Sequence, residues 1–113
     1  MQPEVRVYLF HILQAIKEID SFFDGMIKEF VTFISDTKTK RAVERNLEII
    51  GEAANRIYKI DKDVALPNLR EIIATRNRIV HGYDDISDKI LWTIVIDYLP
   101  ELEIEVKKLL LHS

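Results

Sequence analysis

One eight-residue segment concentrates the side chains of this chain that could do acid–base and phosphate chemistry. It reads Arg76-Asn77-Arg78-Ile79-Val80-His81-Gly82-Tyr83. A guanidinium binds phosphate with two parallel hydrogen bonds, and an imidazole takes up and releases protons near neutral pH. No other stretch of the 113 residues gathers hydrogen-bonding chemistry so tightly. We therefore take Arg76, Asn77 and His81 as candidate catalytic residues.

The helix that would carry this segment has an anomaly in its apolar pattern. Pro67 opens the predicted helix or lies just ahead of it, and Gly82 ends it. With about 100° per residue, Arg76 falls in the middle of the apolar stripe. The other members of the stripe are Leu69, Ile72, Ile73, Ile79 and Val80. An arginine in such a place must be paired, lie at an interface or border a cleft.

Each residue of the segment also has a structural interpretation. Arg76 could simply pair with a carboxylate such as Glu48 or Glu52 on the preceding helix. His81 could be a cation that complements the dipole at a helix end. Asn77 could be a surface residue, and Tyr83 a packed aromatic. The convergence of all four types across one helix end favours the functional interpretation.

Composition restricts the class of protein. Hydrophobic residues make up 48% and charged residues 31%, a balance typical of globular domains. The net charge of −3 argues against a protein that coats nucleic acid non-specifically. The chain has no Cys, and His11, His81 and His112 are too scattered for a zinc motif, so we expect no metal and no cofactor. Without a signal peptide or a spanning apolar run, we expect a soluble cytoplasmic protein.

The apolar periodicity predicts a single all-α domain over residues 1–113, folded as an antiparallel bundle of four to five helices. Only three Gly and three Pro are present, which favours long helices over many short strands. The predicted helices cover about 4–19, 21–34 with Ser21 as N-cap, a third that ends at about 58 with Asp36 or Thr37 as N-cap, 67–82, and 88–111 with Ser87 as N-cap. Pro100 should kink the last helix.

A group of basic residues at the start of the third helix has two interpretations. Its members are Lys38, Lys40, Arg41 and Arg45. They can form a solvated face, which we slightly favour, or a patch that faces phosphate.

At these motifs the chain resembles a known family. Residues 76–83 resemble the Arg-x-x-x-x-His-x-Tyr motif of HepT-like HEPN proteins. Arg45-Asn46-Leu47-Glu48-Ile49-Ile50-Gly51-Glu52-Ala53-Ala54 is similar to that family's second signature, and Trp92 with Leu99-Pro100-Glu101-Leu102 adds to the likeness. The chain departs from the family at Leu69, where relatives often carry Trp, and at Ala74-Thr75, which affects packing more than chemistry.

The resemblance implies a dimeric helical bundle that brings two motifs into one cleft. It implies a metal-independent ribonuclease toxin, with RNA as substrate, neutralised by a minimal nucleotidyltransferase antitoxin. In the better-understood members the antitoxin adds AMP to the motif tyrosine, and the resemblance implies that this residue would be Tyr83 here.

The residue types fit that chemistry. The 2′-hydroxyl of RNA is a built-in nucleophile, and His81 from each of two chains could supply the base and the acid. Arg76 would bind the scissile phosphate, and Asn77 would orient the phosphate or the histidine. One alternative is a non-catalytic nucleotide-binding or regulatory subunit of a nucleotidyltransferase complex. Another is a histidine phosphotransfer bundle, which would need an exposed histidine in mid-helix and ranks lower.

Overall fold

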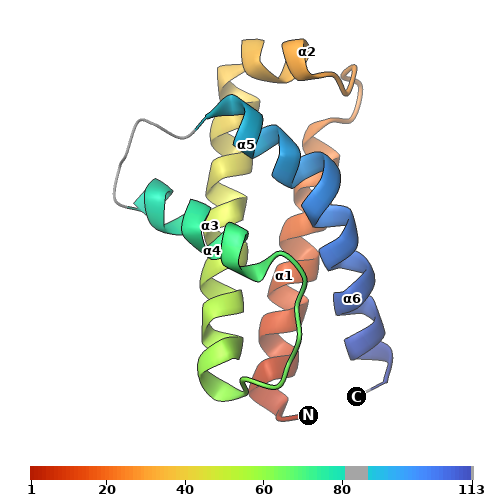
Figure 1. The fold of residues 1–113 in the computed structure, drawn as a ribbon. Coiled ribbons are helices and arrows are strands. Elements are labelled where there is room, and N and C mark those ends of the chain that lie inside the picture. Colours follow the sequence, from red (N-terminus) through yellow and green to blue (C-terminus); the bar gives the residue numbers. More distant parts are fainter. Residues whose placement is uncertain (81–86, 113) are drawn as a thin grey trace.

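The computed structural model describes residues 1–80 and 87–112, and every regular element in these residues is a helix. Helices α3 and α6 both run antiparallel to α1, and α4 crosses α3 (Figure 1). The all-α bundle predicted from the sequence is confirmed. The elements are α1 (Pro3–Phe22), α2 (Phe30–Ser35), α3 (Thr37–Ile60), α4 (Leu69–Val80), α5 (Asp88–Thr93), the π-helical turn η1 (Ile94–Tyr98) and α6 (Leu99–Leu111).

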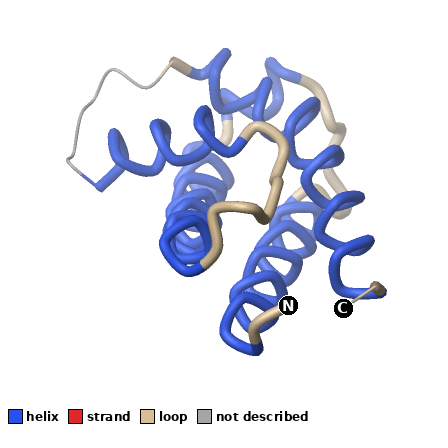
Figure 2. The backbone as a smooth tube through the Cα atoms, turned by 60° about the horizontal axis from the view of Figure 1, so that its bottom comes forward, coloured by secondary structure: helices blue, strands red, loops and turns tan. Residues whose placement is uncertain are grey.

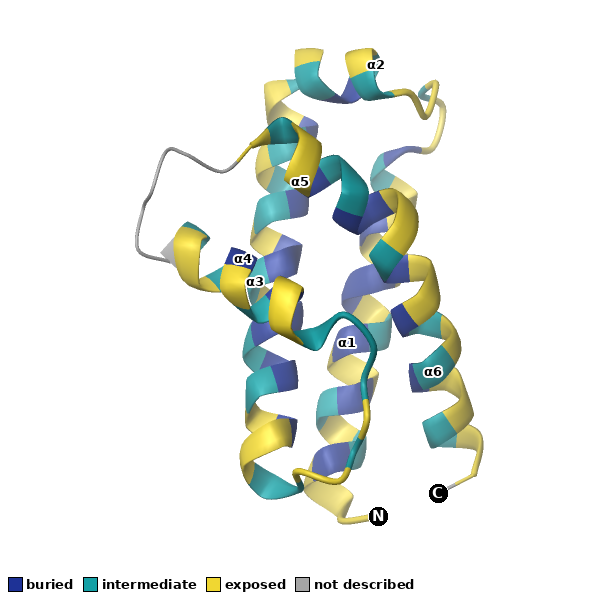
Figure 3. Ribbon diagram, viewed as in Figure 1, coloured by how far each residue is buried: buried dark blue, intermediate teal, exposed yellow. Residues whose placement is uncertain are grey.

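The core lies between α1, α3 and α6 (Figure 3). The stripes predicted for the first and third helices are buried, which confirms them. They comprise Val5, Leu9, Ile12, Ile16 and Ile19 on α1, and Val43, Leu47, Ile50, Ala54 and Ile57 on α3. One buried amide adds a polar link, because Asn46 donates to the carbonyl of Ala15 at 3.1 Å and to the carboxylate of Glu18 at 3.0 Å.

The predicted second helix over residues 21–34 is wrong. Ser21 belongs to the last turn of α1, and its hydroxyl donates to the carbonyl of Glu18 instead of capping a new helix. Gly25 then adopts φ +74°, a left-handed conformation that ends helices. Helical structure resumes only with the six residues of α2. The apolar residues 22, 23, 26, 27, 30, 33 and 34 recur at spacings that fit one helical face, which is why the sequence predicted a single helix here.

Aromatic packing joins the short α2 to α5. The Trp92 ring lies 5.3 Å from Phe33 and 6.2 Å from both Phe23 and Phe30, measured between ring centroids. These contacts explain why a helix of only six residues keeps its place.

Two of the predicted caps are confirmed. The carboxylate of Asp36 accepts from the backbone N–H of Thr39, and the hydroxyl of Ser87 accepts from that of Ile90. At Pro100 the structure has a π-helical turn just before the proline, where the N–H of Leu99 donates five residues back to Ile94. The extra residue in this turn accommodates the missing N–H of the proline.

Helix α4 follows Asn68, which has φ +60°, so its first helical residue stands two after Pro67. The described chain is flat, with extents of 41 × 30 × 17 Å, and the carboxyl end of α4 lies at its edge (Figure 2). The predicted helix end at Gly82 lies outside the described residues. Among those residues, no helix is both long and apolar enough to cross a membrane.

Candidate active site

The apolar face of α4 is largely covered within the chain itself. Ile72 is 1% exposed, while Leu69 and Ile79 pack against the core and Ile73 is half-buried. Thr75 is also buried, and its hydroxyl donates to the carbonyl one turn earlier. Only part of the predicted stripe therefore remains for contact with another chain.

Arg76 lies where α4 packs directly against α3. A Cβ placed on Gly51 would stand 2.5 Å from the Cβ and 2.8 Å from the Cγ of Arg76. The absence of a side chain at Gly51 is therefore what lets the stem of Arg76 rest directly on α3. This contact fixes the direction in which the guanidinium leaves α4.

Two side chains hold the guanidinium of Arg76. Its Nη2 donates to the carboxylate of Glu52, and its Nη1 donates to the Oδ1 of Asn77 at 3.0 Å. Its Nε is buried and has no partner among the described residues. The structural alternative considered for Arg76, an ion pair with α3, is thus present, and the partner is Glu52. The pair is not sealed in the core, because the Arg76 side chain is 24% exposed and that of Glu52 39% exposed.

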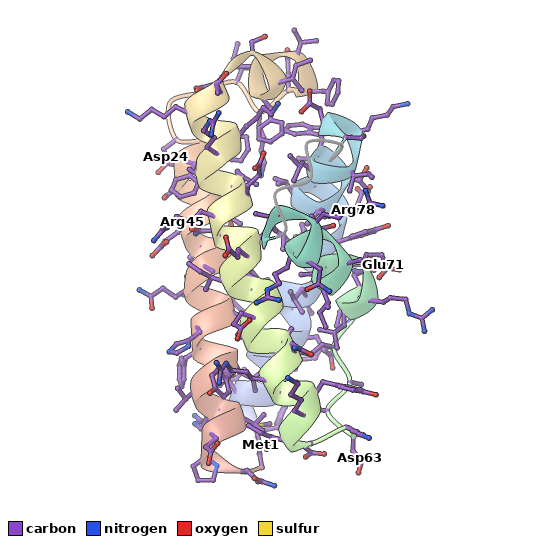
Figure 4. The ribbon with its side chains drawn as sticks, turned by 90° about the vertical axis from the view of Figure 1, so that its left-hand side faces the viewer. Met1, Asp24, Arg45, Asp63, Glu71 and Arg78 are labelled. Atoms are coloured by element: carbon purple, nitrogen blue, oxygen red, sulfur yellow. The ribbon has the colours of Figure 1, made fainter. Side chains whose placement is uncertain are left out.

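Arg76 also borders a cleft of about 560 Å³ where α1, α3 and α4 meet. Figure 4 faces this region: α4 crosses on one side of α3, α1 lies on the other, and the labelled Arg45 extends from α3. The cleft is lined by Tyr8, His11, Arg45, Glu48, Ile49, Glu52, Ala53, Arg56 and Arg76. Three arginines against two glutamates give it a local positive charge in a chain of net charge −3. A cleft of this size and charge fits an anionic small group or a nucleotide.

Arg56 is the second cation tied to Glu52. Its Nε donates to the Glu52 carboxylate at 3.1 Å, and its guanidinium lies 5.9 Å from the centroid of the Tyr8 ring. The Tyr8 phenol, followed by Glu52, raises the pKa of Arg56 above its usual value. His11 meets the Tyr8 ring edge-on at 5.9 Å. One carboxylate therefore holds two guanidinium groups beside two aromatic rings.

The structure brings together only some of the residues singled out in the sequence. Arg76 and Asn77 are adjacent and bonded, whereas the candidate catalytic His81 and the candidate modification residue Tyr83 lie outside the described residues. The basic residues at the start of α3 have different surroundings. Lys40 pairs with Asp88 of α5 at 2.6 Å, whereas Arg45 lines the cleft.

Sequence reasoning missed Tyr8, His11 and Arg56. Their signal was available: Tyr8 and His11 are three residues apart on α1, beside its buried stripe, and Glu52 and Arg56 are four apart on α3. The sequence could not show that this face of α1 and this face of α3 line the same cleft. Within the described residues, no three His, Asp or Glu side chains gather as metal ligands would.

A helical bundle with an arginine fixed beside a polar cleft, and a histidine five residues later in the sequence, is the arrangement that the resemblance to HEPN proteins predicts. More narrowly, the chain belongs to the family described as Ribonuclease HepT-like, which it matches over residues 12–109.

Similar proteins cover nearly the same length. "Probable ribonuclease HepT" of Thermococcus cleftensis is 36% identical over 111 residues, which are 96% of this chain and 98% of the relative. "Putative RNase TTE0752" of Caldanaerobacter subterraneus is 36% identical over 93% of each chain, and "Putative RNase MJ0127" of Methanocaldococcus jannaschii 36% over 88% and 81%. No solved structure matches the chain. The resemblance found in the sequence is thereby confirmed at the level of the family.

Proposed function

We propose that this protein is a metal-independent endoribonuclease that cuts RNA through attack of the 2′-hydroxyl, with Arg76, Asn77 and His81 as its catalytic residues. The observation that carries the proposal is the position of Arg76. Its stem rests on Gly51, and its guanidinium, held by Glu52 and Asn77, borders a positively charged cleft where a phosphate could reach it. Membership of a ribonuclease family supports RNA as the substrate.

In this reaction the ribose 2′-oxygen attacks the neighbouring phosphorus while the bond from phosphorus to the 5′-oxygen breaks. One His81 takes the proton from the 2′-hydroxyl, and a second histidine protonates the departing 5′-oxygen. Arg76 binds the non-bridging oxygens as negative charge builds on them. Asn77, which already accepts a bond from Arg76, helps to orient that guanidinium. The products carry a 2′,3′-cyclic phosphate and a 5′-hydroxyl.

The two histidines come from two chains, so the proposal includes a homodimer. Support comes from the carboxyl end of α4, which lies at the edge of the bundle, where a second chain can approach it. Much of the apolar stripe of α4 is already buried within the chain. The need for two histidines, more than an exposed apolar surface, is therefore the reason to propose a homodimer.

The biological role follows from the family resemblance. We propose a cytoplasmic toxin, neutralised by a partner nucleotidyltransferase that adds AMP to Tyr83. The added phosphate would then compete with RNA phosphate for Arg76 and His81.

The decisive experiment incubates the purified protein with RNA in EDTA and identifies the product ends by mass spectrometry. Cyclic phosphate ends, lost in His81→Ala, support the proposal. Activity that disappears in EDTA and returns with added metal would contradict it. Binding of RNA without cleavage would favour the non-catalytic regulatory subunit instead.

A further inference from the structure

We propose that the cleft between α1 and α3 binds one nucleotide of an RNA strand, next to the phosphate bound by Arg76. In this site Arg56 and Arg76 share a backbone phosphate, while Tyr8 and His11 contact the attached base. The inference rests on the proposed function, because it takes RNA as the ligand, but it concerns residues of α1 and α3 that lie outside the catalytic motif.

The arrangement around Glu52 supports a phosphate position. The two oxygens of this carboxylate accept from Arg56 and Arg76, so two guanidinium groups converge on one anionic group. A phosphate presents the same paired acceptors with more charge. Ion pairs as exposed as these contribute little to stability, so an arriving phosphate can displace Glu52 at small cost.

The aromatic side chains supply the place for a base. Tyr8 is half-buried and His11 exposed, and both line the same cleft as the two arginines. Base–aromatic contact is a common means of holding single-stranded nucleic acid, and it tolerates many sequences. The cleft of about 560 Å³ lies within the size range of pockets that hold small organic ligands, roughly 300–1,000 Å³.

The chain also contains a matched control for this pair of residues. The Lys62 ammonium lies 5.8 Å from the Tyr58 ring centroid, nearly the spacing of Arg56 and Tyr8, and both side chains are exposed. Neither lines the cleft. Lys62 and Tyr58 therefore form the same kind of cation–aromatic contact as Arg56 and Tyr8, but outside the cleft.

The test measures binding of a fluorescent 2′-O-methyl RNA oligonucleotide, which cannot be cut, and cleavage of the unmodified RNA. For Arg56→Gln we expect about tenfold weaker binding and a slope of log Kd against log salt that is reduced by about 0.7, the value of one single-strand phosphate. For Tyr8→Leu we expect at least about fivefold weaker binding with the slope unchanged, and recovery in Tyr8→Phe. In cleavage, KM should rise in both variants, and kcat of Tyr8→Leu should change little, because Tyr8 contacts the base and not the reacting phosphate.

Lys62→Gln and Tyr58→Leu should bind and cut like the wild type, and thermal unfolding should show that every variant is folded. The inference is overturned if the wild type binds RNA and the two cleft variants bind it equally well, or if the control variants lose as much. It is also overturned if the cleft variants lose binding of AMP alone and keep that of RNA. Binding that depends on the cleft in a protein that does not cut RNA would support the inference and refute the proposed function.

Discussion

A methyl group on Gly51 would lie 2.5 Å from the Cβ of Arg76, closer than non-bonded carbon atoms approach in proteins. Within a helix, Gly→Ala normally adds about 0.5–1 kcal/mol of stability, since glycine has the larger entropy to lose. At this position we expect the opposite, a loss of about 1–3 kcal/mol, because α4 must move away from α3. Displacement of Arg76 should also reduce RNA cleavage by tenfold or more.

Gly25→Ala is the matched control. Nothing lies within 4 Å of a Cβ there, but the φ of +74° disfavours alanine by about 1–2 kcal/mol. Urea unfolding should show comparable losses of stability in both variants, with cleavage reduced only by Gly51→Ala. Equal cleavage by the two variants would mean that the contact between α3 and α4 does not position Arg76.

Removal of the charge on Glu52 should strengthen RNA binding. In Glu52→Gln the competitor for Arg56 and Arg76 loses its charge, so we expect Kd at low salt to fall about two- to fivefold. The free energy of unfolding should change by less than about 1 kcal/mol. Glu103→Gln, which removes a surface ion pair with Lys107 on α6, should leave binding unchanged. Weaker binding, together with a loss of 3 kcal/mol or more, would show that the Glu52 pair is structural.

The two serines assigned as caps from the sequence should behave differently. Ser87→Ala should cost about 1 kcal/mol, because its hydroxyl accepts from the N–H of Ile90 at the start of α5. Ser21→Ala should change stability by less than about 0.5 kcal/mol, since Ser21 is exposed and bonds back into α1. Thermal unfolding of both variants decides this, and an equal loss would restore Ser21 as a cap.

The contrast between these serines shows how far the sequence could predict the structure. Ser87 and Asp36 (or its neighbour Thr37) precede clear apolar stripes, so local chemistry is enough to place the helix starts to within a residue. Ser21 lies in a run where Phe22, Phe23 and Met26 obscure the period, and tertiary packing on Trp92 decides the outcome. Tertiary contacts also explain what was missed at the site.

The sequence alone showed that Arg76 is a charged residue within an apolar stripe, because the residues that form this stripe all belong to the same helix. The sequence predicted Glu48 or Glu52 as the carboxylate that pairs with Arg76. Which of the two forms the ion pair depends on where α4 crosses α3, and the structure shows Glu52. Tyr8 and Arg56 come together only through the pairing of α1 with α3, across 48 residues of sequence. Long-range contacts of this kind leave no local pattern.

Asp36 predicts a pH dependence of stability. The hydrogen bond from the backbone N–H of Thr39 holds the pKa of Asp36 below its ordinary value of 3.8. A lowered pKa means that this residue stabilises the fold above pH 3.8, and that its contribution is lost as the pH falls through the lower, folded-state pKa. Asp36→Ala should therefore be less stable than the wild type at pH 7, and the difference should shrink in acid. A difference that stays constant down to pH 2 would argue against this assignment.

The most direct test of the central claim is the single-turnover rate of RNA cleavage by Arg76→Lys in EDTA. Lysine keeps the positive charge but not the planar pair of donors, and it cannot reproduce the bonds of the guanidinium to Glu52 and Asn77. We predict a rate at least about a hundredfold below that of the wild type, in a protein that still unfolds cooperatively. A rate within about twofold of the wild type would contradict the assignment of Arg76 as the phosphate-binding catalytic residue.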